Sequence, residues 1–168
     1  MKKNIAILYG GDSSEFVVSE RSAGEIYASV DTELFNPYMI RVKGNQWICK
    51  DGKRDMKVDL NDFSADKSKL KFDYAFIIIH GTPGEDGKLQ AYLDMMGVPY
   101  NTPGVLTSAL TFNKMACKLY LRSYDILTPE AVLYRKREPV NINTILGKAG
   151  LPCFVKPNNG GSSFGTTK

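Results

Sequence analysis

The chain has 168 residues, which is the size of one domain or of one domain and part of a second. With 43% hydrophobic and 24% charged residues, its composition is typical of a globular protein and excludes a disordered chain, and no segment approaches transmembrane length. The net charge of +4 is small and the cations alternate with acids, so no nucleic-acid-binding or membrane-binding surface is predicted. The three cysteines are widely spaced, which predicts neither a zinc site nor a disulfide framework and fits a reducing, cytoplasmic setting.

Strands and helices are predicted to alternate along the first part of the chain. In chain order, the pattern predicts a strand at 4–9, a helix over 17–27 behind the cap-type residues 12–15, a hairpin of strands at 37–42 and 46–49, loops and short elements over 50–71, a strand at 74–79 and a helix ending at 96. The strand at 74–79 is an unbroken apolar run, which predicts burial on both faces. This alternation predicts an α/β fold, a Rossmann-like, mostly parallel sheet with helices on both faces.

The turn residues at 101–104 mark the best candidate for a domain boundary. Beyond them, the pattern predicts helices at 105–112 and 113–124, a strand at 131–134, a short helix at 142–147 and a strand at 153–156.

Two loops follow predicted parallel strands, where open α/β sheets bind their ligands. Residues 80–87 (HGTPGEDG), named here the histidine loop, begin with the only histidine, and their glycines allow a ligand to approach the backbone. A lone histidine is more often structural, but this position favours a functional role, in which His80 donates a hydrogen bond to a carboxylate or an oxyanion. Residues 10–15 (GGDSSE), named here the first turn, end in Glu15. This acid either benefits from the helix dipole or binds an ammonium group, and spacing leaves both interpretations open.

Three lysines beyond the predicted domain boundary are candidates for binding an anion. Lys114 and Lys118 lie one turn apart on the same helix face, and such a pair is most often exposed to solvent. Lys114, however, lies near the predicted helix N-terminus, where the helix dipole disfavours a lysine unless an anion binds there. Lys156 leaves a predicted strand and enters residues 158–165, named here the glycine loop. Its backbone N–H groups can bind phosphate, although a surface hairpin is the alternative. The phosphate-binding candidates here are Lys156, Gly160, Gly161, Ser162 and Ser163.

Together and in this order, these segments resemble the N-terminal part of the D-alanine–D-alanine ligases, a family of the ATP-grasp superfamily. The matching residues are 10–15 with Val18 and Ser19, 80–87 with Leu89 and Gln90, 97–104, Ser108 and Ala109, Asn113 and Lys114 with Lys118, 127–129, 154–157 and 161–165. The histidine loop is specific to the family and the other segments support it. Asn113 stands where the family often has Asp, and Ala91 replaces a common glycine.

The resemblance implies ATP-dependent ligation of two D-alanines through an acyl phosphate, with Mg²⁺ neutralising the phosphates. It implies that Glu15 binds the ammonium group of the first D-alanine, that His80 lies near its carboxylate and that Ser162 hydrogen-bonds with Glu15. It also implies that Lys114 and Lys156 bind the ATP phosphates beneath the glycine loop.

Family members are about twice as long as this chain, so residues 1–101 are predicted as an N-terminal substrate-binding domain and residues 102–168 as the incomplete start of an ATP-grasp α+β domain. The metal ligands are then expected outside the chain, which is predicted to be inactive alone. Ligases that use D-lactate or D-serine as second substrate, and a non-catalytic binding module, remain alternatives. The resemblance also implies a homodimer through the N-terminal domain. In this sequence, Trp47 and the nearby aromatic residues are candidates for that contact.

Overall fold

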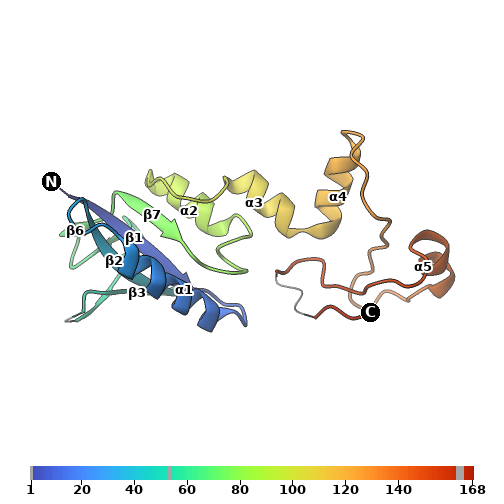
Figure 1. The fold of residues 1–168 in the computed structure, drawn as a ribbon, viewed down its shortest axis with the longest axis horizontal. Coiled ribbons are helices and arrows are strands. Elements are labelled where there is room, and N and C mark those ends of the chain that lie inside the picture. Colours follow the sequence, from blue (N-terminus) through green and yellow to red (C-terminus); the bar gives the residue numbers. More distant parts are fainter. Residues whose placement is uncertain (1, 53, 162–164) are drawn as a thin grey trace. The chain divides into compact units, whose positions relative to one another are not determined.

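The structure, a computed structural model, describes residues 2–52, 54–161 and 165–168 (Figure 1). The chain forms two compact units, unit 1 (Met1–Ala109) and unit 2 (Leu110–Lys168), which divide within α3 (Val105–Phe112). The domain boundary placed after residue 101 stays a prediction. No helix among the described residues is long and apolar enough to cross a membrane.

Unit 1 is built around a five-stranded sheet. Its elements are β1 (Lys3–Gly10), α1 (Phe16–Ser29), β2 (Phe35–Lys43), β3 (Gln46–Lys50), β4 (Asp55–Lys57), β5 (Ser64–Ala65), β6 (Leu70–Lys71), β7 (Tyr74–Ile77), α2 (Lys88–Met96) and the start of α3. The strand order is β4-β3-β2-β1-β7, in which β2, β1 and β7 are parallel while β3 and β4 are antiparallel. The α/β class and the hairpin of β2 and β3 are confirmed, and the sheet is mixed.

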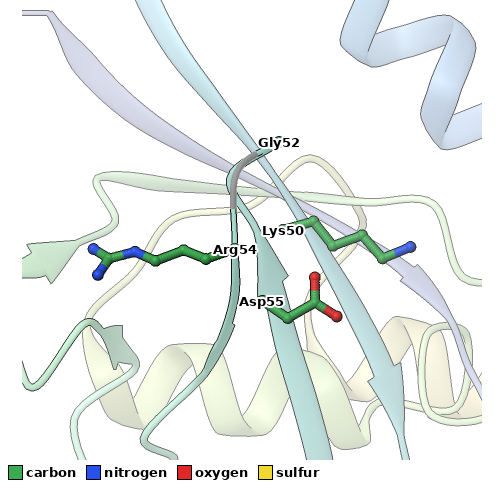
Figure 2. A pocket seen from close by; sticks show the side chains of 4 residues that line it. All are labelled: Lys50, Gly52, Arg54 and Asp55. Carbon is green, nitrogen blue, oxygen red and sulfur yellow. The ribbon is translucent and has the colours of Figure 1, made fainter.

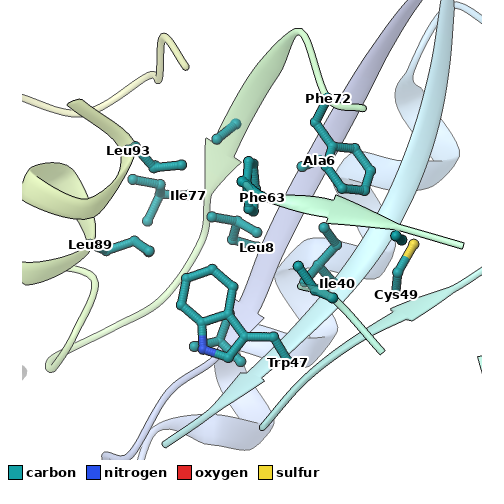
Figure 3. Packing of buried hydrophobic residues seen from close by; sticks show 14 of the residues in the cluster. Ala6, Leu8, Ile40, Trp47, Cys49, Phe63, Phe72, Ile77, Leu89 and Leu93 are labelled. Carbon is teal, nitrogen blue, oxygen red and sulfur yellow. The ribbon is translucent and has the colours of Figure 1, made fainter. Parts of the chain in front are cut away.

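The central strand β1 separates two apolar clusters, because successive side chains of a strand point to opposite faces. Ala6 and Leu8 lie in the larger cluster with Leu89 and Leu93 of α2 (Figure 3). On the other face, Ile7 and Tyr9 pack with Ala23 of α1, which confirms helices on both faces.

The prediction that residues 74–79 are buried on both faces is wrong in part. β7 pairs with β1 at the edge of the sheet, and among the described residues only an isolated bridge between Ala75 and Tyr100 follows on its other side. Buried and half-buried residues alternate along it. The position of a strand within a sheet depends on pairing, which an apolar run does not encode.

Residues 50–71 contribute more to the core than their polar composition predicts. Phe63 is 1% exposed, and its ring contacts Trp47, Phe72 and Tyr92, with centroids 6.2, 5.1 and 5.9 Å away. Trp47 is itself only 7% exposed, and its Nε1 donates to the Gly44 carbonyl at 3.1 Å. Trp47 therefore packs inside unit 1, and its assignment as a dimer contact is wrong, while the homodimer itself stays a prediction.

The three cysteines are free. Burial raises the pKa of the Cys49 thiol to about 12, with further contributions from Asp51 and Asp55, so this thiol stays protonated and unreactive at neutral pH.

Unit 2 contains the end of α3, followed by α4 (Lys114–Arg122) and α5 (Ile142–Lys148), close to the helices predicted there. The strands predicted at 131–134 and 153–156 are absent from its described residues, where isolated bridges join Val155 to Thr167 and Asn113 to Asn159. A strand needs neighbours for its N–H and C=O groups, and local sequence cannot supply them. None of the described residues of unit 2 is buried, so this part of the chain has no hydrophobic core of its own.

Candidate functional site

In unit 1, the first turn and the histidine loop lie side by side, because they follow the parallel strands β1 and β7. The N–H of Asp12 donates to the Thr82 carbonyl at 3.1 Å. The Ser13 hydroxyl donates to the His80 carbonyl at 2.7 Å and accepts from the N–H of Glu15 at 3.2 Å. Ser13 thus connects the two residues predicted to bind the first substrate. Sequence analysis missed this role, because any serine in a turn satisfies the same local pattern.

Glycine makes this close approach of the two loops possible. Gly11 has φ +89°, and a Cβ there would lie 2.6 Å from Cγ2 of Ile79 and 3.0 Å from the Thr82 carbonyl. At Gly84, a Cβ would lie 2.4 Å from the Ile79 carbonyl, which is backbone and cannot move aside. A side chain at Gly11 would therefore push the two loops apart, and one at Gly84 would distort the histidine loop against Ile79, which directly precedes it.

The side chains of Glu15 and His80 are both half-buried, and neither has a hydrogen-bond or ion-pair partner among the described residues. Glu15 occupies the N-cap position of α1 without a side-chain cap bond, so the prediction that residues 12–15 cap this helix through their side chains is not met at the N-cap. The Glu15 carboxylate is therefore available to an external cation, and the His80 imidazole to an external acceptor.

The acidic and amide groups that follow His80 hold the loop together. The Glu85 carboxylate accepts from the N–H of Gly81 at 2.7 Å, and Nε2 of the buried Gln90 donates to the Gly84 carbonyl at 2.7 Å. Part of the histidine motif is thus structural.

Asp86 is the second acid of the loop, with only 12% of its side chain exposed. Its Oδ2 accepts from the Thr82 hydroxyl at 2.7 Å and from Nζ of Lys88 at 2.6 Å. Burial alone would raise the pKa of Asp86, but these hydrogen bonds outweigh it, and the net result is a lowered pKa. The charged form of Asp86 therefore stabilises the fold.

Replacing Asp86 by Asn should lower the free energy of unfolding near pH 7 by about 1–3 kcal/mol, because hydrogen bonds to an ionised group are lost. The pKa of Asp86 in the folded protein lies below its unfolded value of about 3.9. The contribution of Asp86 to the free energy of unfolding is therefore complete above the unfolded pKa, and it is lost as the pH falls through the folded pKa. Urea unfolding from neutral to acid pH should show the gap to wild type closing. Asp55→Asn, at an exposed strand position, is the control. A difference in free energy of unfolding between wild type and Asp86→Asn that stays constant with pH would contradict the stabilising role of the charged Asp86.

In unit 2, the N-terminus of α4 meets the glycine loop. Nζ of Lys114 donates to the Gly160 carbonyl at 2.7 Å, and the N–H of Lys114 donates to the Asn158 carbonyl at 3.0 Å. A lysine at a helix N-terminus was expected to need a bound anion. Here side-chain amide oxygens of the chain itself accept from the free N–H groups of the helix: Oδ1 of Asn158 from Met115, and Oδ1 of Asn113 from Ala116. The structure thus brings together Lys114 and Gly160, which are far apart in sequence.

The other predicted lysines differ in their surroundings. Nζ of Lys118 donates to the Pro129 carbonyl at 2.6 Å. Lys156 is exposed, and its Nζ lies 5.4 Å from the ring centroid of Phe154. Gly161 is half-buried, while Ser162 and Ser163 lie outside the described residues.

A hollow of about 420 Å³ lies elsewhere, beside the hairpin of β3 and β4, and is lined by Lys50, Gly52, Arg54 and Asp55. Figure 2 shows Lys50 and Arg54 pointing in opposite directions, so their charges do not converge on one ligand. Within the described ranges, no group of three or more His, Cys, Asp or Glu side chains is placed to hold a metal ion.

Comparison with known proteins gives a consistent result. The model of a family described as "D-ala D-ala ligase N-terminus" matches residues 4–103. The D-alanine–D-alanine ligases of Bacteroides fragilis and Phocaeicola vulgatus are 49% and 48% identical over 172 residues, covering 100% of this chain and 53% of each relative. The chain therefore spans about half the length of these curated relatives.

Solved structures agree in fold. D-alanyl-alanine synthetase A from Vibrio cholerae is 30% identical with a TM-score of 0.79, covering 99% of this chain and 51% of that one. The VanG D-Ala:D-Ser ligase from Enterococcus faecalis is 27% identical with a TM-score of 0.82, covering 99% of this chain and 55% of that one. A Bacillus anthracis D-alanine–D-alanine ligase complexed with ATP is 28% identical with a TM-score of 0.74, covering 96% and 49%.

Proposed function

This chain belongs to the family of D-alanine–D-alanine ligases, and on that basis we propose that the protein joins two D-alanines at the expense of ATP in the cytoplasm. In the proposed reaction, the carboxylate of the first D-alanine attacks the γ-phosphorus of ATP, the bond from that phosphorus to the bridging oxygen breaks, and an acyl phosphate and ADP form. The amine of the second D-alanine then attacks that carbonyl, and phosphate leaves. The dipeptide would serve peptidoglycan synthesis.

The first D-alanine is a small zwitterion, and unit 1 offers one group for each of its charges. Glu15 would bind the ammonium group, because its carboxylate is half-buried and has no partner among the described residues. His80 would lie near the carboxylate, on a loop that Ser13 holds against the turn carrying Glu15. These contacts are the observation that most directly supports the assignment.

The ATP phosphates would bind in unit 2. Lys114 and the exposed Lys156 would supply positive charge, and the backbone N–H groups of Gly160 and Gly161 and the loop serines Ser162 and Ser163 would donate hydrogen bonds. Phosphoryl transfer depends mainly on positioning and electrostatic stabilisation, which lysines and a glycine-rich loop can provide. Mg²⁺ would neutralise the phosphates when bound, with ligands from outside the described residues.

Phosphate release with ATP and D-alanine tests this function. The full-length protein should release phosphate and form the dipeptide only when both substrates are present, and L-alanine should not replace D-alanine. The 168-residue chain alone should give no turnover, because no metal-ligand cluster occurs in its described ranges. Phosphate release that is independent of D-alanine would contradict the proposal.

A D-Ala:D-Ser ligase remains a second candidate, because the structure of one such enzyme matches this chain with a TM-score of 0.82. Comparing turnover of the full-length protein with D-alanine, D-serine and D-lactate as second substrate decides between them. Preference for D-serine would favour the second candidate.

A further inference from the structure

Two asparagine side chains fasten the glycine loop to the N-terminus of α4. Oδ1 of Asn158 accepts from the N–H of Met115 at 2.9 Å, and Nδ2 of Asn158 donates to Oδ1 of Asn113 at 2.9 Å. Oδ1 of Asn113 also accepts from the N–H of Ala116 at 3.0 Å, as an N-cap residue does. With the Asn158 carbonyl bound to the N–H of Lys114, three N–H groups that a helix leaves unpaired are satisfied.

The consequence for Lys114 is a fixed side chain. The backbone N–H of Lys114 donates to the Asn158 carbonyl. Nζ of Lys114 donates to the carbonyl of Gly160, two residues further along the glycine loop, at 2.7 Å. The ammonium group is thus held beside the loop by contacts within the chain itself. A cation placed before its ligand arrives loses less conformational entropy on binding.

We propose that Asn158 is a positioning residue, which holds the glycine loop on α4 so that the ammonium group of Lys114 is preorganised for a nucleoside triphosphate. This inference rests on the proposed function, because it assigns to Lys114 the ATP phosphates as ligand. Asn158 acts through Lys114, because its own side-chain amide bonds to the N–H of Met115 and to Oδ1 of Asn113.

The chemistry of the two asparagines is unequal. Asn158 uses both its donor and its acceptor, so neither Asp nor Ala can replace it fully. Asn113 uses only its oxygen, so Asp at that position keeps both hydrogen bonds. Asn158→Ala and Asn158→Asp should therefore disturb Lys114, while Asn113→Asp should not.

Lysine acetylation followed by mass spectrometry measures the position of Lys114 directly in the full-length protein. Acetylation of Lys114 is compared with that of Lys148, an exposed lysine of α5 that serves as internal reference. In Asn158→Ala and Asn158→Asp, acetylation of Lys114 should be about five- to tenfold faster, the change expected from one lost hydrogen bond. Asn113→Asp and the matched control Asn143→Ala, at an exposed position of α5, should behave as wild type.

A second arm adds MgATP over a concentration series. MgATP should protect Lys114 in the wild type, and half-protection of Asn158→Ala should need about tenfold more nucleotide, while the KM for D-alanine stays unchanged. If Asn158 had only a structural role, Asn158→Ala would lower the fraction of folded protein, but the ATP concentration that gives half-protection of Lys114 would stay as in wild type.

Unchanged Lys114 acetylation in both Asn158 variants, or protection at the same ATP concentration as wild type, would overturn the inference and leave the proposed function standing. Absence of protection in the wild type itself would instead overturn the assignment of Lys114 to ATP, and with it the positioning role of Asn158.

Discussion

Replacing Glu15 by Gln should raise the KM of the full-length protein for the first D-alanine by about 10- to 100-fold, with the KM for ATP unchanged. Gln has the same shape as Glu but no charge, so the substrate ammonium group would lose its counter-ion in a half-buried position. Truncating one partner of a buried charge pair costs about 2–5 kcal/mol, and partial exposure of Glu15 places the effect at the lower end. The main-chain contact between Ser13 and Glu15 is unaffected, because it uses the N–H of Glu15.

Initial rates over a D-alanine series at saturating ATP measure this effect. Glu20→Gln is the matched control, because Glu20 is an exposed acid on the same helix. The control should leave both KM values as in wild type. An unchanged KM for D-alanine in Glu15→Gln would remove Glu15 from the substrate site.

Replacing Phe63 by Ala should lower the free energy of unfolding of unit 1 by about 3–5 kcal/mol. The ring is 1% exposed and contacts three other aromatic rings, so its removal leaves a cavity among rigid neighbours. Phe63 has φ +47°, a left-handed backbone conformation that Ala tolerates no better than Phe. The difference between the two proteins therefore measures side-chain packing.

Urea unfolding followed by Trp47 fluorescence reports this change, because Trp47 lies in the same aromatic cluster. Phe63→Leu, which keeps most of the volume, should cost less than Phe63→Ala. Leu34→Ala should be nearly neutral, since Leu34 is 60% exposed in the same unit. Equal stability of Phe63→Ala and wild type would show that the cluster is not the core of unit 1.

Local patterns predicted the elements whose formation depends on nearby residues. The helices α1, α2, α3, α4 and α5 and the hairpin of β2 and β3 lie where periodicity, glycines and turn residues place them. Strands predicted at 131–134 and 153–156 are absent from the described residues, because a strand depends on partners elsewhere in the chain.

The order of the motifs along the chain was sufficient to identify the ligase family and to single out Glu15, His80, Lys114 and Lys156. A motif records which residue types occur at which spacing, and it contains no information about which of them pair within the protein. For this reason the structural role of Asp86 in the histidine loop came only from its hydrogen bonds, while the ligand-binding role of His80 stays a proposal.

The same limit explains why Ser13 and Asn158 were not recognised from their neighbours in the chain. Ser13 bonds to a residue 67 positions away, and Asn158 to one 45 positions away. Trp47 was likewise mistaken for a surface residue, because burial is decided by what folds over a side chain. Sequence determined which chemical groups this protein has; folding, by bringing distant segments within hydrogen-bond distance, decided which of those groups remain available to bind a ligand.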